Sequence, residues 1–169
     1  MKKLVKIIVL LVVYVINVSC QQQSLQKYIV EKSDSSEFKS FTFYPKDFQE
    51  KGQIVEKFDL LDVVKNVNVL IYNKTDSLKF EVEKQEIQSI LSDRKYQNLF
   101  RFNQGNAKFQ IDYVGSDSDI EEIVVFGIEK QRKLFLLRVL TDKLTTEQLT
   151  DMATTFQQTI VGKNFLNLF

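Results

Sequence analysis

Cysteine, serine, lysine and acidic residues are the side chains of this chain that could do chemistry, because it contains no histidine. Histidine is the commonest general base and metal ligand near neutral pH. Its absence excludes a Ser-His-Asp triad, a Cys-His pair and any zinc site that contains histidine. A serine activated by a lysine, a pair of carboxylates, or no catalysis at all are the possibilities that remain.

Cys20 is the only cysteine, and it stands where an apolar N-terminal segment turns polar. An internal disulfide is therefore impossible, so the fold must depend on its hydrophobic core. The preceding residues begin with three lysines and continue as an apolar run over residues 7–18. This run is too short for a membrane-spanning helix, which takes about 20 apolar residues. We therefore predict an export signal over residues 1–19, with cleavage between Ser19 and Cys20.

The residues before the cysteine, Asn17-Val18-Ser19, resemble the lipobox of bacterial lipoproteins, in which the cysteine sulfur receives a diacylglycerol before signal cleavage. Only a thiolate supplies the nucleophilic sulfur for this thioether. Asn17 departs from the pattern, which prefers leucine there. The resemblance implies that Cys20 is lipidated, and the two or three acyl chains of a mature lipoprotein would hold it to a membrane persistently. The alternative is that Cys20 merely ends a signal peptide.

Ser77 is the second candidate for chemistry. With Lys79 or Lys84 it could form a Ser-Lys hydrolase device, because a desolvated lysine can deprotonate a serine. Ser77 and Lys79 would diverge on a helix, however, and we expect Ser77 to cap that helix. The tripeptide Asp76-Ser77-Leu78 also resembles the short O-glycosylation acceptor of Bacteroidota. Ser77 is therefore a possible glycosylation site.

Two groups of acidic residues are the candidates for a metal site or for acid–base catalysis. The first lies between two expected strands: Asp117, Asp119, Glu121 and Glu122. It lacks the glycine and the distal glutamate of a calcium-binding EF-hand loop. The second is spread around an expected helix: Glu81, Glu83 and Glu86. We expect both groups to be solvated, and we predict no metal site, no catalytic residue and no cofactor.

Chain length and net charge limit the number of domains and the kinds of partner that we expect. Residues 20–169 are enough for one ordinary domain with a sizeable core. The mature chain would carry 20 lysines and arginines against 22 aspartates and glutamates, which gives nothing to attract nucleic acid. We predict a signal peptide at 1–19, a lipidated cysteine with a short tether at 20–24 and a single domain at 25–169. Five residue steps from Cys20 to Leu25 reach at most about 18 Å, so the domain would sit against the membrane.

The periodicity of apolar residues predicts helices and strands along the whole mature chain. Helices are expected at 24–32, 77–92 and from Thr145, with a weaker one near 47–61; Thr145 and Gln148 would form a capping box. Strands are expected at 40–44, 67–72, 96–102, 107–113, 120–128 and 134–141, with a hairpin turn at 103–106. This order predicts an α+β fold: an antiparallel sheet, with a C-terminal four-strand meander plus one or two N-terminal strands, and helices packed on one face.

The mature chain resembles the Bacteroidota lipoproteins that carry the domain of unknown function 4252. The resemblance is carried by the helix that starts at Ser24, the Phe41-Thr42-Phe43 strand, the Val69-Leu70-Ile71-Tyr72 strand and the stretch from Tyr96 to Leu140. It covers nearly all of the mature chain. Because the family is described without an activity, the resemblance implies lipoprotein character and location but supplies no site residues.

These observations lead to one expected function and two alternatives. We expect a membrane-anchored envelope lipoprotein that binds a protein or small ligand, or serves as an accessory module, without catalysis. Its partners would be the membrane, through the N-terminal lipid, and an envelope protein, but no nucleic acid. No acidic residue closely follows Cys20, which by analogy favours the periplasmic face of the outer membrane. The alternatives are an envelope hydrolase with a Ser-Lys or carboxylate device and a stress-response accessory protein.

Overall fold

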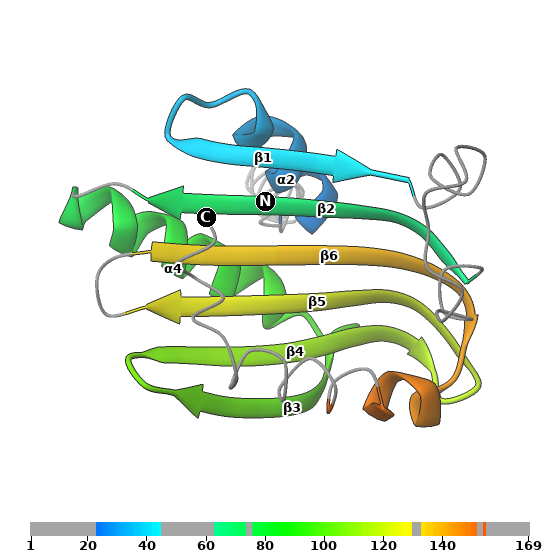
Figure 1. The fold of residues 1–169 in the computed structure, drawn as a ribbon. Coiled ribbons are helices and arrows are strands. Elements are labelled where there is room, and N and C mark those ends of the chain that lie inside the picture. Colours follow the sequence, from blue (N-terminus) through cyan, green and yellow to red (C-terminus); the bar gives the residue numbers. More distant parts are fainter. Residues whose placement is uncertain (1–22, 45–62, 74–75, 130–132, 152–153, 155–169) are drawn as a thin grey trace, which may run out of the picture.

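The computed structural model describes residues 23–44, 63–73, 76–129, 133–151 and 154. Within them, six strands form one antiparallel sheet, and two helices pack against it (Figure 1). The helices are α2 (Leu25–Ser33) and α4 (Ser77–Leu91). The strands are β1 (Phe38–Phe43), β2 (Val64–Asn73), β3 (Gln97–Gln104), β4 (Ala107–Ser116), β5 (Asp119–Glu129) and β6 (Lys133–Leu144). Residues 146–151 form a further helical segment.

The sheet is built from a meander that is extended on one side by the first two strands. The order across it is β1-β2-β6-β5-β4-β3, and every neighbouring pair is antiparallel. β2 joins the meander along β6, so α4 must cross the sheet to connect β2 with β3 on the far edge. The α+β class and the antiparallel sheet that we expected are confirmed.

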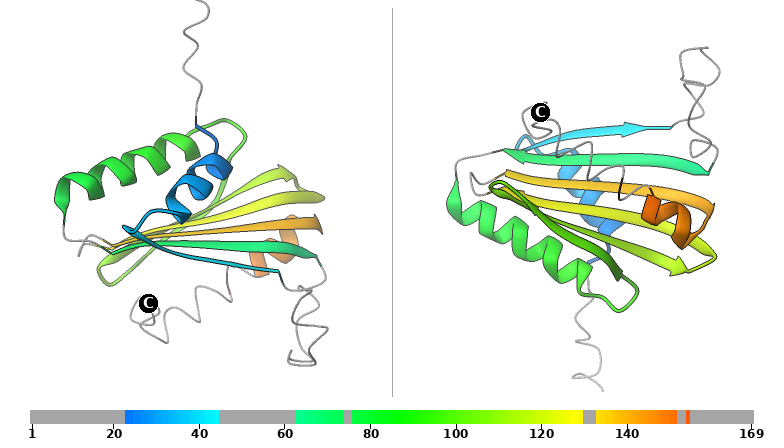
Figure 2. Two further views of the ribbon diagram at one scale, coloured as in Figure 1. Left: turned by 90° about the horizontal axis from the view of Figure 1, so that it is seen from above. Right: turned by 60° about the horizontal axis from the view of Figure 1, so that its bottom comes forward.

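Both faces of the sheet are covered by apolar side chains. α2 and α4 lie on one face (Figure 2), where the buried cluster includes Leu25, Ile87 and Val124. The helical segment at 146–151 lies on the opposite face, where Leu149 joins a second cluster. We expected the helices on one face, and this is wrong for the C-terminal segment. The reason lies in the central strands. Successive residues in the middle of β5 are buried, and because neighbouring side chains point to opposite faces, both faces of the sheet must be covered.

Two helix starts use the caps that the sequence offers. The Ser24 hydroxyl accepts the backbone N–H of Lys27 at 3.2 Å at the start of α2. Thr145 and Gln148 exchange side-chain to backbone hydrogen bonds of 3.0 and 3.3 Å, which confirms the predicted capping box. The helix expected near 47–61 lies outside the described residues.

Gly115 lies near the end of β4, next to the turn into β5, and its backbone conformation requires glycine. Its φ is +128°, and a Cβ there would lie 2.3 Å from the carbonyl oxygen of Asp119. Gly115→Ala is therefore expected to lower the free energy of unfolding by about 1–3 kcal/mol, as measured by urea denaturation. Gly105→Ala is the matched control, because Gly105 has a φ of +54° but a Cβ there meets no atom within 4 Å. Equal losses at the two glycines would contradict this account.

Candidate functional site

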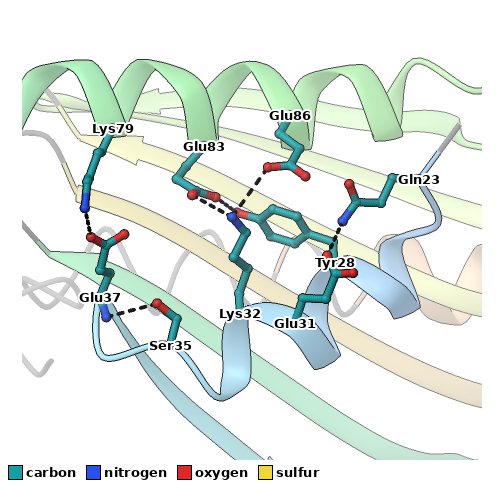
Figure 3. A network of polar contacts seen from close by, with 9 residues as sticks. All are labelled: Gln23, Tyr28, Glu31, Lys32, Ser35, Glu37, Lys79, Glu83 and Glu86. Atoms are coloured by element: carbon teal, nitrogen blue, oxygen red, sulfur yellow. Dashed lines mark hydrogen bonds and ion pairs between the residues drawn. The ribbon is translucent and has the colours of Figure 1, made fainter.

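The residues predicted to carry lipidation and cleavage, Cys20 and Ser19, lie outside the described residues. The described chain begins at Gln23, three residues after Cys20, and enters α2 almost at once. Gln23 precedes this helix, and its side-chain amide donates to the Glu31 carboxylate in α2 at 2.9 Å (Figure 3). The first element after the predicted lipid is therefore α2, and its attachment to the domain decides how that lipid would hold the protein.

Ser77 is exposed in the first turn of α4. The helix cap is Asp76, because its carboxylate accepts the backbone N–H groups of Leu78 and Lys79 at 2.9 and 3.1 Å. Our expectation that Ser77 caps the helix is wrong by one residue. The whole Asp76-Ser77-Leu78 sequence is exposed to solvent, so Ser77 stays a candidate for glycosylation.

The serine–lysine device that the sequence left open is not assembled at Ser77. The Lys79 ammonium is bonded to the Glu37 carboxylate instead (Figure 3), and the hydrogen bond and charge of Glu37 raise the pKa of Lys79. A lysine that acts as a general base needs a lowered pKa. Lys84, the other candidate base, is paired with Glu81. Both lysines therefore serve as partners of carboxylates.

A buried polar network joins α2 to α4, and we call it the Glu83 network. The Glu83 carboxylate is buried, and it accepts the Tyr28 hydroxyl at 2.7 Å and the Lys32 ammonium at 2.6 Å (Figure 3). Lys32 also lies 3.5 Å from Glu86. We expected Glu81, Glu83 and Glu86 to form a solvated face, which is wrong for Glu83. A buried carboxylate is tolerated here because both of its oxygens have donors.

The pKa shifts show what the Glu83 network can do chemically. Burial, and then the hydrogen bond to Glu83, raise the pKa of Tyr28 far above its ordinary value. Burial lowers the pKa of Lys32, but the hydrogen bond and the charges of Glu83 and Glu86 outweigh it, and the net shift is upward. At neutral pH the tyrosine is thus protonated and the lysine charged. In these states both side chains donate hydrogen bonds to Glu83, and the network links the two helices.

A second buried network, the Arg138 network, fixes the start of α2 to the sheet. Arg138 on β6 lies 3.1 Å from the Glu122 carboxylate on β5 and also donates to the side-chain oxygen of Gln26 in α2. The Tyr96 hydroxyl donates to Glu122 at 3.5 Å, and burial together with the Glu122 charge raises the pKa of Tyr96. We expected the acidic run that ends at Glu122 to be solvated, which is wrong for Glu122.

Asp112 on β4 is a third buried acid. Its carboxylate accepts side-chain amide groups from Asn98 at 2.9 Å and from Gln110 at 2.6 Å. Burial raises the pKa of Asp112 although both of these hydrogen bonds oppose the shift. Within the described part of the chain, the side chains that bond to this acid are therefore neutral amides.

The sequence contains a signal for these buried charges, although it is a weak one. Glu83 lies on the same helical face as Phe80 and Ile87, and Arg138 continues the alternation of Leu134 and Leu136. A charged residue in phase with buried apolar neighbours must find a partner inside the protein. The sequence could have flagged these positions, but it could not have named their partners.

Two further observations concern metal sites and membrane spans in the described residues. No group of three or more acidic or cysteine side chains among them is arranged to hold a metal ion. No helix in this part of the chain is long and apolar enough to cross a membrane.

Comparison with known families gives one match. The model of the family described as Domain of unknown function (DUF4252) matches residues 30–152. The chain belongs to this family. The DUF4252 region runs from the middle of α2 into the C-terminal helical segment, and it contains Lys32, Glu83, Glu122 and Arg138. No curated protein and no solved structure matches the chain.

Proposed function

We propose that this DUF4252 protein is a lipid-anchored envelope lipoprotein of a Bacteroidota-type bacterium. In this proposal Cys20 carries the lipid on the periplasmic face of the outer membrane, and the domain binds a partner or serves as an accessory module without catalysis. The observation that carries the proposal is the single cysteine at the end of a short export signal. A thiol in that position, with no second cysteine to pair with, is suited to lipidation.

Support for a non-catalytic role comes from the side chains that could have acted as bases or nucleophiles. The pKa values of Lys32, Lys79 and Tyr28 are all raised, and each of these groups is bonded to a carboxylate. A lysine or tyrosine that acts as a base or nucleophile needs its pKa lowered toward neutrality. The ionisable groups of the helical layer, which we define as α2 and α4, thus favour a binding or accessory module over a hydrolase.

Cys20→Ser is expected to move the protein from the membrane fraction to the soluble fraction or to leave it with an uncleaved signal. The wild-type protein should yield an N-terminal peptide that begins at Cys20 and is heavier by a diacylglycerol, as measured by mass spectrometry. The same spectrum reports whether the peptide that contains Ser77 carries a glycan. A wild-type protein with a free Cys20 thiol that begins at Met1 would overturn the proposal.

A further inference from the structure

We infer that the outer face of the helical layer is the surface that rests on the lipid bilayer. This inference rests on the proposed function, because it requires a lipid at Cys20. It adds an orientation: α2 and α4 face the membrane, and the opposite face of the sheet is turned away from it. Three observations carry it, namely the length of the tether, the side chains on the outer face, and the pairing of its charges.

The tether is shorter than the domain is wide. Three residue steps separate Cys20 from Gln23, and they span at most about 11 Å. A folded chain of this length has a radius of gyration of about 15 Å, so its full width is more than twice the tether. The domain therefore cannot turn over beneath its lipid. The side that carries Gln23 and α2 must face the bilayer, and Figure 2 shows α4 on that same side.

The outer side of the helical layer carries exposed apolar side chains next to the exposed charged side chains of Lys27, Glu31 and Glu81. In α2 the inward residues Leu25, Tyr28 and Ile29 place Val30 on the outer side. In α4 the inward face is the stripe through Phe80 and Ile87. The opposite stripe of α4 consists of Leu78, Val82, Gln85 and Ser89. Val30, Leu78 and Val82 are 54%, 80% and 59% exposed, so apolar side chains project where the tether brings lipid close.

Charges on the two helices are paired within the protein. Each lysine of α2 and α4 lies within ion-pair distance of a carboxylate: Lys27 with Glu31, Lys32 with Glu83 and Glu86, Lys79 with Glu37, and Lys84 with Glu81. Such a surface offers no lysine cluster to attract anionic headgroups. It can approach a zwitterionic bilayer closely because its cations keep their partners. The contact should therefore depend little on anionic lipid.

An exposed aromatic residue on β1 provides a control position on the face of the sheet that lacks α2 and α4. Phe41 is 49% exposed and is in register with Val69, which packs against the buried cluster on the face without α2 and α4. The short tether holds this face away from the bilayer. Phe41 is thus a large exposed apolar side chain that the inferred orientation keeps out of lipid, which makes it the matched control position.

The chain contains no tryptophan, so one introduced tryptophan reports on one position. We would place it at Val82→Trp or at Phe41→Trp in the full-length lipidated protein, reconstituted into phosphatidylcholine vesicles with brominated acyl chains. The Val82→Trp probe is expected to lose most of its fluorescence to bromine and to shift its emission to shorter wavelength. The Phe41→Trp probe is expected to keep its fluorescence. Adding anionic phosphatidylglycerol should leave both results unchanged.

The controls separate this orientation from the lipid anchor itself. Mass spectrometry first shows whether each variant carries lipid at Cys20, and circular dichroism shows whether it is folded. Gln85→Trp, on the same outer stripe of α4, replaces the Val82 probe if that variant does not fold. A lipidated protein that is quenched at Phe41→Trp rather than on α4, or at neither position, overturns the orientation and leaves the anchor intact. A protein without lipid at Cys20 overturns both proposals.

Discussion

Replacing Arg138 with methionine is expected to lower the free energy of unfolding by about 3–5 kcal/mol, because it leaves the Glu122 carboxylate buried without its counter-charge. The two side chains are both buried and lie 3.1 Å apart. What remains for Glu122 is the Tyr96 hydroxyl at 3.5 Å, which is too weak a contact to replace a guanidinium. Urea denaturation followed by circular dichroism measures the loss.

The double variant Arg138→Met with Glu122→Leu is the decisive control. It removes both charges, and apolar groups of similar size can replace a buried ion pair at little cost. We therefore expect the double variant to be more stable than Arg138→Met alone. Arg138→Lys keeps the charge but loses the planar fork that reaches Glu122 and Gln26 together, so its stability should be intermediate. A loss below about 1 kcal/mol for Arg138→Met would show that Glu122 is solvated in solution.

The local elements of the fold could be predicted from the sequence because their signals are local. β4 alternates between buried and more exposed residues over its first half, and its hairpin with β3 turns at the predicted polar segment 103–106. Thr145 and Gln148 lie three residues apart, so their capping box is visible without any knowledge of the rest of the fold. Periodicity and caps of this kind fix where elements begin and end.

The placement of the helices and of the first two strands could not be predicted, because it depends on contacts between distant residues. Tyr28 and Glu83 are 55 positions apart, and Arg138 and Gln26 are 112 apart. The sequence shows that Glu83 and Glu122 are acidic, and acidic residues are usually solvated. Only the position of α2 over the sheet reveals that both carboxylates are enclosed. The meander of β3 to β6 was predicted, because its strands pair with their neighbours in sequence, but the buried networks and the pairing of β2 with β6 depend on distant residues and were missed.

The packing of the C-terminal helical segment on the other face of the sheet has a related explanation. β5 contains Ile123, Val124, Val125 and Phe126 in succession, and such a run is apolar on both sides of a sheet. We expected helices on one face of the sheet because of the order of helices and strands along the chain. The central strands instead have apolar residues on both faces of the sheet. Leu149 packs on the face that α2 and α4 do not cover.

Tyr28→Phe is expected to lower the free energy of unfolding by about 1.5–3 kcal/mol, because the lost hydroxyl donates to a buried charged carboxylate. Tyr72→Phe is a closely matched control. Both tyrosines are 0% exposed, but within the described part of the chain the Tyr72 hydroxyl has no hydrogen-bond partner. Removing an unsatisfied buried hydroxyl should leave stability unchanged or raise it. Equal losses for the two variants would mean that the Glu83 network contributes nothing beyond packing.

The comparison between the two tyrosines must be made near pH 7, and their pKa values explain why. Burial raises the pKa of both side chains above the ordinary value of 10.0, with Glu83 adding to the shift at Tyr28. A raised folded-state pKa contributes stability that is fully present below pH 10.0 and is lost as the pH rises toward that folded-state value. Above pH 10 the wild-type protein therefore loses stability as the pH rises, and either phenylalanine substitution would make this loss smaller. At pH 7 both phenols are protonated, so the difference between the variants reports the hydrogen bond that holds α2, and with it the predicted lipid anchor, to the rest of the domain.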